Sequence, residues 1–167
     1  MFNIQIWDID NPKPNKNETN FFLRKSDIKK NKRNISIHSY IQKNSKSLRD
    51  EYLKWIYELG LTKIENKTVI EFLKVKNNFS YWWMSSINEK SNFLENSPEI
   101  ETAIKVIALN KHIDKIKINQ ISLFTDNKIL LKFYNYFCKK NNIILKHKLY
   151  KKEYQTFNIK SLYEYFP

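Results

Sequence analysis

The stretch that decides the fold is Ile118-Asn119-Gln120-Ile121-Ser122-Leu123-Phe124, which leads through Thr125-Asp126-Asn127 into residues 128–140 and then into Ile143-Ile144-Leu145-Lys146-His147. The first and last segments are short and largely apolar, which is typical of strands. The middle segment spaces its apolar side chains as a helix does, at Ile129, Leu130, Phe133, Tyr134 and Phe137. About thirty residues is the usual size of a right-handed parallel crossover. Residues 118–149 therefore predict an α/β fold, a Rossmann-like parallel sheet flanked by helices.

Shorter segments extend this prediction toward the N-terminus. Residues 4–7 alternate in polarity and predict a first strand, and Ile35-Ser36-Ile37-His38 predicts a second. The prolines and asparagines of residues 11–20 predict a loop, and residues 11–34 together form a basic, loop-rich segment. No internal repeat is visible, and 167 residues suit one domain better than two.

Three segments between the predicted strands should be helical. In residues 47–60, Ser47 is the expected N-cap and Gly60 the expected left-handed residue that ends the helix. Residues 69–75 predict a short helix. Ser97 and Pro98 suit the N-cap and first position of a third helix, which runs to about His112. The expected buried faces are Leu48, Tyr52, Trp55, Ile56 and Leu59 in the first helix, and Ile100, Ala103, Ile104, Ile107 and Ala108 in the third.

The charge of the chain is strongly positive, with a formal net value of +13. The excess is concentrated in residues 13–54 and 111–167, and it favours polyanions or an anionic membrane face as partners. Only Arg24, Arg33 and Arg49 are arginines, although arginine is the residue whose planar fork best grips phosphates and guanine edges. A non-catalytic basic module for nucleic acid or another anionic partner is therefore the alternative function, not the first one.

Glycine and cysteine usage excludes several classes of site. Gly60 is the single glycine, so a glycine-rich phosphate loop or dinucleotide fingerprint cannot form, and we expect no cofactor in this chain. Cys138 is the single cysteine and should be a buried structural thiol. His38, His112 and His147 lack metal-ligand spacing, so we expect no metal site.

A family resemblance rests on three segments. They are Leu48-Arg49-Asp50-Glu51-Tyr52-Leu53-Lys54-Trp55, then Phe79-Ser80-Tyr81-Trp82-Trp83-Met84-Ser85-Ser86 with Glu89-Lys90-Ser91, and the predicted helix from Ser97-Pro98 to about His112. Together they resemble the N-terminal region of bacterial surface-carbohydrate (polysaccharide or O-antigen) biosynthesis proteins, which are glycosyltransferase-like. The resemblance covers residues 48–112.

This resemblance implies the N-terminal half of a GT-B fold, which holds the acceptor site. The nucleotide-sugar donor would then bind a C-terminal domain or a partner chain, so the chain is expected to be a fragment of a longer two-domain protein and to be inactive alone. The implied partners are that missing domain, a carbohydrate acceptor and, to cover the cleft face, a second copy in a homodimer. The N-terminus does not resemble a signal peptide and no apolar run could span a bilayer, so we expect a cytoplasmic protein, peripheral at the inner membrane face.

Five residues are candidates for substrate binding. Trp82 and Trp83 are adjacent and must point in different directions, so we expect one buried ring and one at a partly exposed seam; in the functional alternative, one ring lines a cleft and stacks on a sugar. Lys90 with Ser91 could contact an anionic sugar or a phosphate. Asp126 follows a predicted parallel strand, where α/β folds place ligands, and it is also the expected N-cap of the next helix. Glu89 is the candidate catalytic base, with a surface ion pair as its alternative role.

Overall fold

The computed structural model confirms an α/β fold with a parallel, Rossmann-like sheet. It describes residues 2–25, 31–76, 79–85, 98–114 and 116–150. Five strands lie in the order β3-β2-β1-β8-β9, and every neighbouring pair is parallel. The strands are β1 (Phe2–Asp8), β2 (Thr19–Phe22), β3 (Asn34–Ser36), β8 (Ile118–Thr125) and β9 (Ile144–Leu149).

The unit predicted at residues 118–149 is present. β8 and β9 pair in parallel, from Gln120 opposite Ile144 to Thr125 opposite Leu149, and α5 (Lys128–Lys140) joins them. Two details differ from the prediction. Asn127, not Asp126, caps α5, because the Asn127 Oδ1 accepts hydrogen bonds from the backbone of Ile129 and Leu130. Ile129, expected to face inward, is 45% exposed at the start of the helix.

The N-terminal part contains one strand more than predicted. β2 lies partly in the predicted loop, and Phe21 and Phe22 are buried in it. The strand predicted at 35–38 is shorter, because Ser36 ends β3 and its side chain caps α1 (Ile37–Lys43) by accepting from the Ser39 backbone. An N-cap serine turns the chain into a helix at the point where polarity alone suggests that a strand continues.

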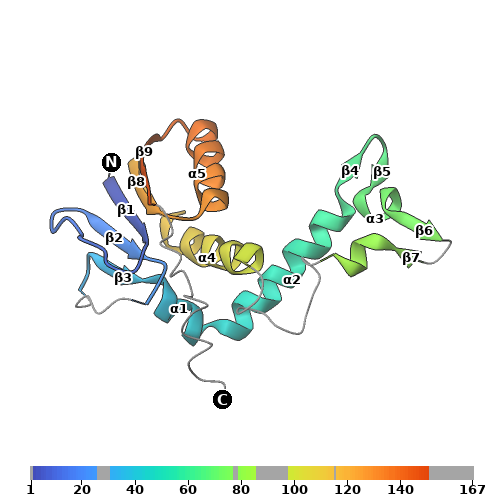
Figure 1. Cartoon of the computed structure of the whole chain (residues 1–167), viewed down its shortest axis with the longest axis horizontal. Helices are drawn as coiled ribbons and strands as arrows, with labels where there is room; N and C mark the ends of the chain where they lie inside the picture. The colour runs from blue at the N-terminus through green and yellow to red at the C-terminus, as the bar shows by residue number, and fades with distance from the viewer. Residues whose placement is uncertain (1, 26–30, 77–78, 86–97, 115, 151–167) are drawn as a thin grey trace, which may run out of the picture.

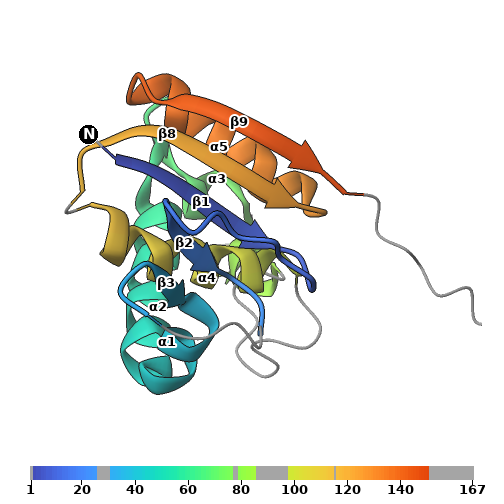
Figure 2. The same cartoon turned by 90° about the vertical axis from the view of Figure 1, so that its left-hand side faces the viewer.

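The helices α1, α4 and α5 cover one face of the sheet (Figures 1 and 2). The main hydrophobic core lies between that face and these helices, and includes Ile4, Ile6, Phe21, Leu123 and Tyr134. The link from β1 to β2 crosses the opposite face (Figure 2), where the Asn15 backbone donates to the Gln5 side chain at 3.2 Å. The sheet is thus wound on both sides, with a loop in place of a helix on the second face.

The helix predicted at residues 47–60 is longer, and both of its predicted ends are wrong. α2 spans Ser45–Leu61, with Asn44 at the N-cap position, while Ser47 is exposed within its first turn. Gly60 is helical and does not have a positive φ. Glycine at this position lets the side chains of Trp82 and Ile70 pack closely against α2. An added Cβ would lie 2.8 Å from the Trp82 Nε1 and 3.0 Å from the Ile70 Cδ1. Of the predicted buried face, Trp55 is 42% exposed.

A small projection follows α2. The sequence predicted only one short helix in this part of the chain. The projection consists of β4 (Lys63–Ile64), β5 (Lys67–Thr68), α3 (Val69–Phe72), β6 (Lys74–Lys76), β7 (Phe79–Ser80) and η1 (Tyr81–Met84). We call the described residues between 63 and 84 the arm. In Figure 1 the arm extends from the far end of α2, away from the sheet. Val75, predicted to pack in a helix, is exposed on β6.

A second hydrophobic cluster joins the arm to the rest of the molecule. Trp82 packs with Tyr52 and Ile56 of α2 and with Ile100 and Ile104 of α4 (Pro98–Ile113). Pro98 begins α4 as predicted, and the proposed cap Ser97 lies outside the described residues. No helix among the described residues is long and apolar enough to cross a membrane.

Candidate functional site

The carboxyl ends of β1 and β8 form the switch point of this sheet. The chain continues from β1 to β2 on one side and from β8 to β9 on the other, so the two connections diverge at this edge of the sheet. Open α/β sheets bind their ligands at this position. Asp8 ends β1 here, Thr125 ends β8, and Asp126 follows directly. We call Asp8, Asp10, Arg24, Lys105, Thr125 and Asp126 the switch-point cluster.

Asp8 is the buried centre of the cluster, with 1% of the residue exposed. Its Oδ1 accepts from the Arg24 Nε at 3.3 Å and from the Lys105 Nζ at 3.1 Å. Its Oδ2 accepts from the Thr125 hydroxyl at 3.0 Å. A buried carboxylate is tolerated when it is both paired and hydrogen-bonded, and Asp8 meets both conditions.

Arg24 connects the buried centre to solvent. Its guanidinium also pairs with Asp10 at 3.3 Å and with Asp126. Burial opposes the charge of Arg24, but the carboxylates of Asp8, Asp126 and Asp10 outweigh it and raise the Arg24 pKa. The side chain of Asp10 is 80% exposed and that of Asp126 12%, so these two carboxylates form the outer edge of the cluster.

Lys105 brings the second cation from α4. Its ammonium lies 2.7 Å from the Glu101 carboxylate one turn earlier, as well as 3.1 Å from Asp8. Four carboxylates, from Asp8, Asp10, Asp126 and Glu101, therefore contact the two cations Arg24 and Lys105.

A chain of hydrogen bonds leads from the cluster to a neighbouring groove. Thr125 donates to Asp8 and accepts from the Asn127 backbone at 2.9 Å. The Asn127 side-chain amide donates to the Thr102 hydroxyl at 2.8 Å. Thr102 in turn lines a cavity of about 400 Å³ between α2, α4 and α5, which we call the groove. The cluster and the groove are therefore linked through hydrogen-bonded side chains.

The groove is mainly apolar and aromatic. Tyr52 and Trp55 of α2 form one side of it, with ring centroids 5.9 Å apart, and Phe133 of α5 contributes to its lining. Asn110 also lines the groove, and its Oδ1 is buried with no hydrogen-bond donor among the described residues. A small-molecule site commonly combines apolar walls with a few polar groups that fix orientation. The remaining lining residues are Thr102, Ala103, Val106, Ile107 and Ile129.

The structure separates the predicted site residues. Trp82 is 6% exposed in the second hydrophobic cluster, and Trp83 is 51% exposed on the arm, so one ring is buried and one is open. Asp126 lies in the switch-point cluster. The remaining candidates, Glu89, Lys90 and Ser91, lie outside the described residues.

Cys138, which was expected to be a buried structural thiol, is placed as predicted. Cys138 is buried in α5, and burial raises its pKa to about 11, which leaves little reactive thiolate. The His112 ring lies edge-on to Tyr40 with centroids 4.7 Å apart. Within the described part of the chain, no three His, Cys, Asp or Glu residues are grouped so that they could hold a metal ion.

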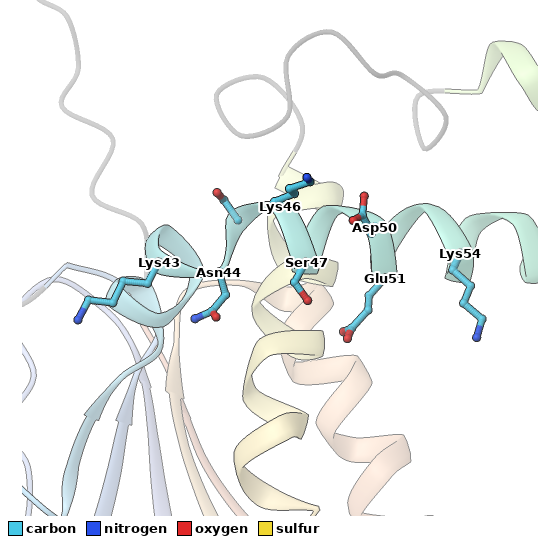
Figure 3. A pocket seen from close by; sticks show the side chains of 8 residues that line it. Lys43, Asn44, Lys46, Ser47, Asp50, Glu51 and Lys54 are labelled. Atoms are coloured by element: carbon cyan, nitrogen blue, oxygen red, sulfur yellow. The ribbon is translucent and has the colours of Figure 1, made fainter.

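A larger depression, of about 560 Å³, lies along the junction of α1 and α2 (Figure 3). Its side chains are polar, but they do not converge. Lys46 and Asp50 point to one side of α2 and Glu51 to the other (Figure 3), where Glu51 pairs with Lys111 of α4. This arrangement is a solvated helix surface that holds no common point for a ligand.

Sequence reasoning missed most of the site. Asp126 was identifiable because it follows a clear strand, and Asp8 carries the same signal at the end of residues 4–7. Arg24 and Lys105 carry no local signal, because they are far from Asp8 in the sequence and meet it only through the sheet order. Trp55 fitted the buried stripe of its helix, and only the position of α5 shows that it lines a groove.

Comparisons with family models, curated proteins and solved structures gave no match to this chain.

Proposed function

We propose that this chain is the acceptor-side domain of a glycosyltransferase-like protein of bacterial surface-carbohydrate biosynthesis, acting with a separate donor-binding domain or chain. The observation that carries the proposal is the aromatic groove joined to the switch-point cluster through Asn127 and Thr102. This surface offers a sugar both kinds of contact that it needs.

Carbohydrates are amphipathic in a particular way. Their C–H faces pack on aromatic rings, and their hydroxyls both donate and accept hydrogen bonds. In the groove, Trp55 presents a half-exposed ring beside Tyr52. In the cluster, the carboxylates of Asp10 and Asp126 can accept from hydroxyls, while the Arg24 guanidinium, a quarter exposed, can donate. Asn110 adds an acceptor within the groove.

The segments that carry the family resemblance contribute to this surface. Residues 48–55 form the turns of α2 that supply Tyr52 and Trp55, and α4 supplies Thr102, Val106 and Asn110. This overlap supports the proposal. Within it, the chain binds and orients the acceptor, and the donor-binding part supplies the activated sugar.

The experiment is a binding titration of neutral oligosaccharides against the full chain, followed by saturation-transfer NMR. We expect Trp55→Ala to weaken binding by about tenfold, the usual effect of losing one stacked ring. Tyr57→Ala is the matched control, because Tyr57 is 56% exposed on the same helix and does not line the groove. Oligosaccharide binding that is equal in both variants would refute the proposal, as would the absence of any binding.

The alternative function, binding of nucleic acid or another polyanion, also has a specific observation in its favour. The edge strand β9 exposes Lys146 and Lys148, and α5 exposes Lys139 and Lys140 close to its end. Binding of labelled DNA or RNA through these lysines must weaken steeply between low and physiological salt. Without salt-sensitive binding at micromolar protein, this alternative is excluded.

A further inference from the structure

The arm exposes an unusual number of large apolar side chains. Six of them lie within α3, β6, β7 and η1: Phe72 at 60%, Val75 at 64%, Phe79 at 43%, Tyr81 at 58%, Trp83 at 51% and Met84 at 66%. Single exposed apolar residues are ordinary on protein surfaces, but a group of this kind marks a docking site. Trp82, by contrast, is buried against α2 and α4 and holds the arm in place.

Lysines accompany these apolar side chains. Lys63, Lys67, Lys74 and Lys76 are all exposed in the strands of the arm. One of the two glutamates of this segment, Glu71, is engaged in a capping box, where its carboxylate accepts from the Thr68 backbone at 2.7 Å. The arm therefore presents aromatic and aliphatic groups with an excess of positive charge.

We propose that the arm docks on the surface of an anionic lipid bilayer. Aromatic side chains favour the boundary between headgroups and acyl chains, and lysines near that boundary are attracted to anionic lipids. Lysine stems can cover apolar surface while their ammonium groups stay among the headgroups. The arm also projects away from the sheet (Figure 1), so its end can meet a flat surface without obstruction by the α/β core.

The lysines favour a lipid surface over an apolar protein as the partner. Anionic headgroups can pair with them without a cavity of defined shape. The proposal is independent of sugar binding, since the groove lies between α2, α4 and α5 and none of its lining residues belongs to the arm.

The first experiment is co-sedimentation of the full chain with large unilamellar vesicles. We expect binding to phosphatidylcholine vesicles with about 30% phosphatidylglycerol, and binding weaker by about tenfold or more to pure phosphatidylcholine. The double variant Phe72→Ser with Val75→Ser should lose about tenfold in partitioning. Tyr136→Ser is the matched control, since Tyr136 is 68% exposed on α5, and it should change partitioning less than about twofold.

A second pair of variants separates local charge from net charge. Lys74→Glu with Lys76→Glu and Lys132→Glu with Lys139→Glu change the net charge of the chain equally, but the second pair lies on α5. We expect the arm pair to lose about tenfold in binding to the anionic vesicles and the α5 pair to lose much less. Equal losses would show attraction by net charge alone and would overturn the proposal.

Trp83 provides a direct report of insertion. Lipids brominated along the acyl chain should quench the tryptophan fluorescence of the bound chain, and Trp83→Phe should remove most of that quenching while vesicle binding is retained. Failure of the wild-type chain to bind anionic vesicles would overturn the proposal. So would a dimer in solution that Phe72→Ser with Val75→Ser separates into monomers without any vesicle binding, since the arm would then be a self-association surface.

Discussion

Asp8 holds two cations in place from a position that water hardly reaches. Its carboxylate receives Arg24, Lys105 and the Thr125 hydroxyl, and only 1% of the residue is exposed. Asp8→Asn would keep the shape of the side chain and remove its charge, which leaves Lys105, itself 8% exposed, with Glu101 as its remaining partner. We expect a loss of about 3–5 kcal/mol in the free energy of unfolding, measured by urea denaturation.

Asp10→Asn is the control for this change. Asp10 also contacts Arg24, but its side chain is 80% exposed, and an exposed ion pair contributes about 1 kcal/mol or less. If the two variants unfold at the same urea concentration, the buried network does not stabilise the fold in the way that the contacts suggest.

The same cluster shows how far the sequence predicts a site. An acidic residue at the end of a strand is a local pattern, so Asp126 could be named in advance. The other members of the cluster come from β1, from the residues that follow β2 and from the second turn of α4, and only the folded chain brings them together. The cap of α5 was misassigned by one residue, because Asp126 and Asn127 are both good N-caps and Arg24 engages the first of them.

At the scale of elements, Gly60 allows Trp82 and Ile70 of the arm to pack closely against α2. Alanine in a helix is usually about 1 kcal/mol more favourable than glycine. Here the added methyl group would meet the Trp82 ring at 2.8 Å and Ile70 at 3.0 Å. We therefore expect Gly60→Ala to lower the free energy of unfolding by about 1–3 kcal/mol, the usual cost of overpacking, despite its better helix propensity.

Ser47→Ala is the companion measurement on the same helix. Ser47 is exposed within α2, and Asn44 takes the N-cap position, so this change should leave stability the same or raise it slightly. A decrease of about 1 kcal/mol in the free energy of unfolding would instead indicate that Ser47 is the N-cap of α2. An increase in stability for Gly60→Ala would mean that Trp82 does not pack against α2 as described.

Long periodic elements were predictable and short ones were not. β8, α5 and β9 each have enough residues to show their own spacing, and the prediction for residues 118–149 is confirmed. β4, β5 and β7 have two residues each, too few for any period. Gly60 shows a different limit, because a helical glycine that permits close packing has the same sequence signature as one that ends a helix.

Across the residues that the structure describes, the molecule contains two packed hydrophobic clusters that share α2 and α4. The larger one lies under the sheet and contains Ile4, Ile6, Ile121 and Leu123, all fully buried. The smaller one holds the arm through Trp82. The free energy of local opening depends on the number of buried apolar contacts and on the exposure of backbone hydrogen bonds. It should therefore be lower for the smaller cluster than for the larger one.

Native-state hydrogen exchange tests this division. We expect the backbone amides of Ile6 and Leu123, in the centre of the sheet, to exchange only through global unfolding. The amides of Thr68 and Val69, where the short strands meet α3, should exchange through local opening at a free energy lower by at least about 2 kcal/mol. Their exchange should also be nearly insensitive to denaturant, because local opening exposes little surface. Equal protection of the arm and the sheet would show that the molecule unfolds as one unit, and that Trp82 couples the arm to the core more tightly than the separate clusters indicate.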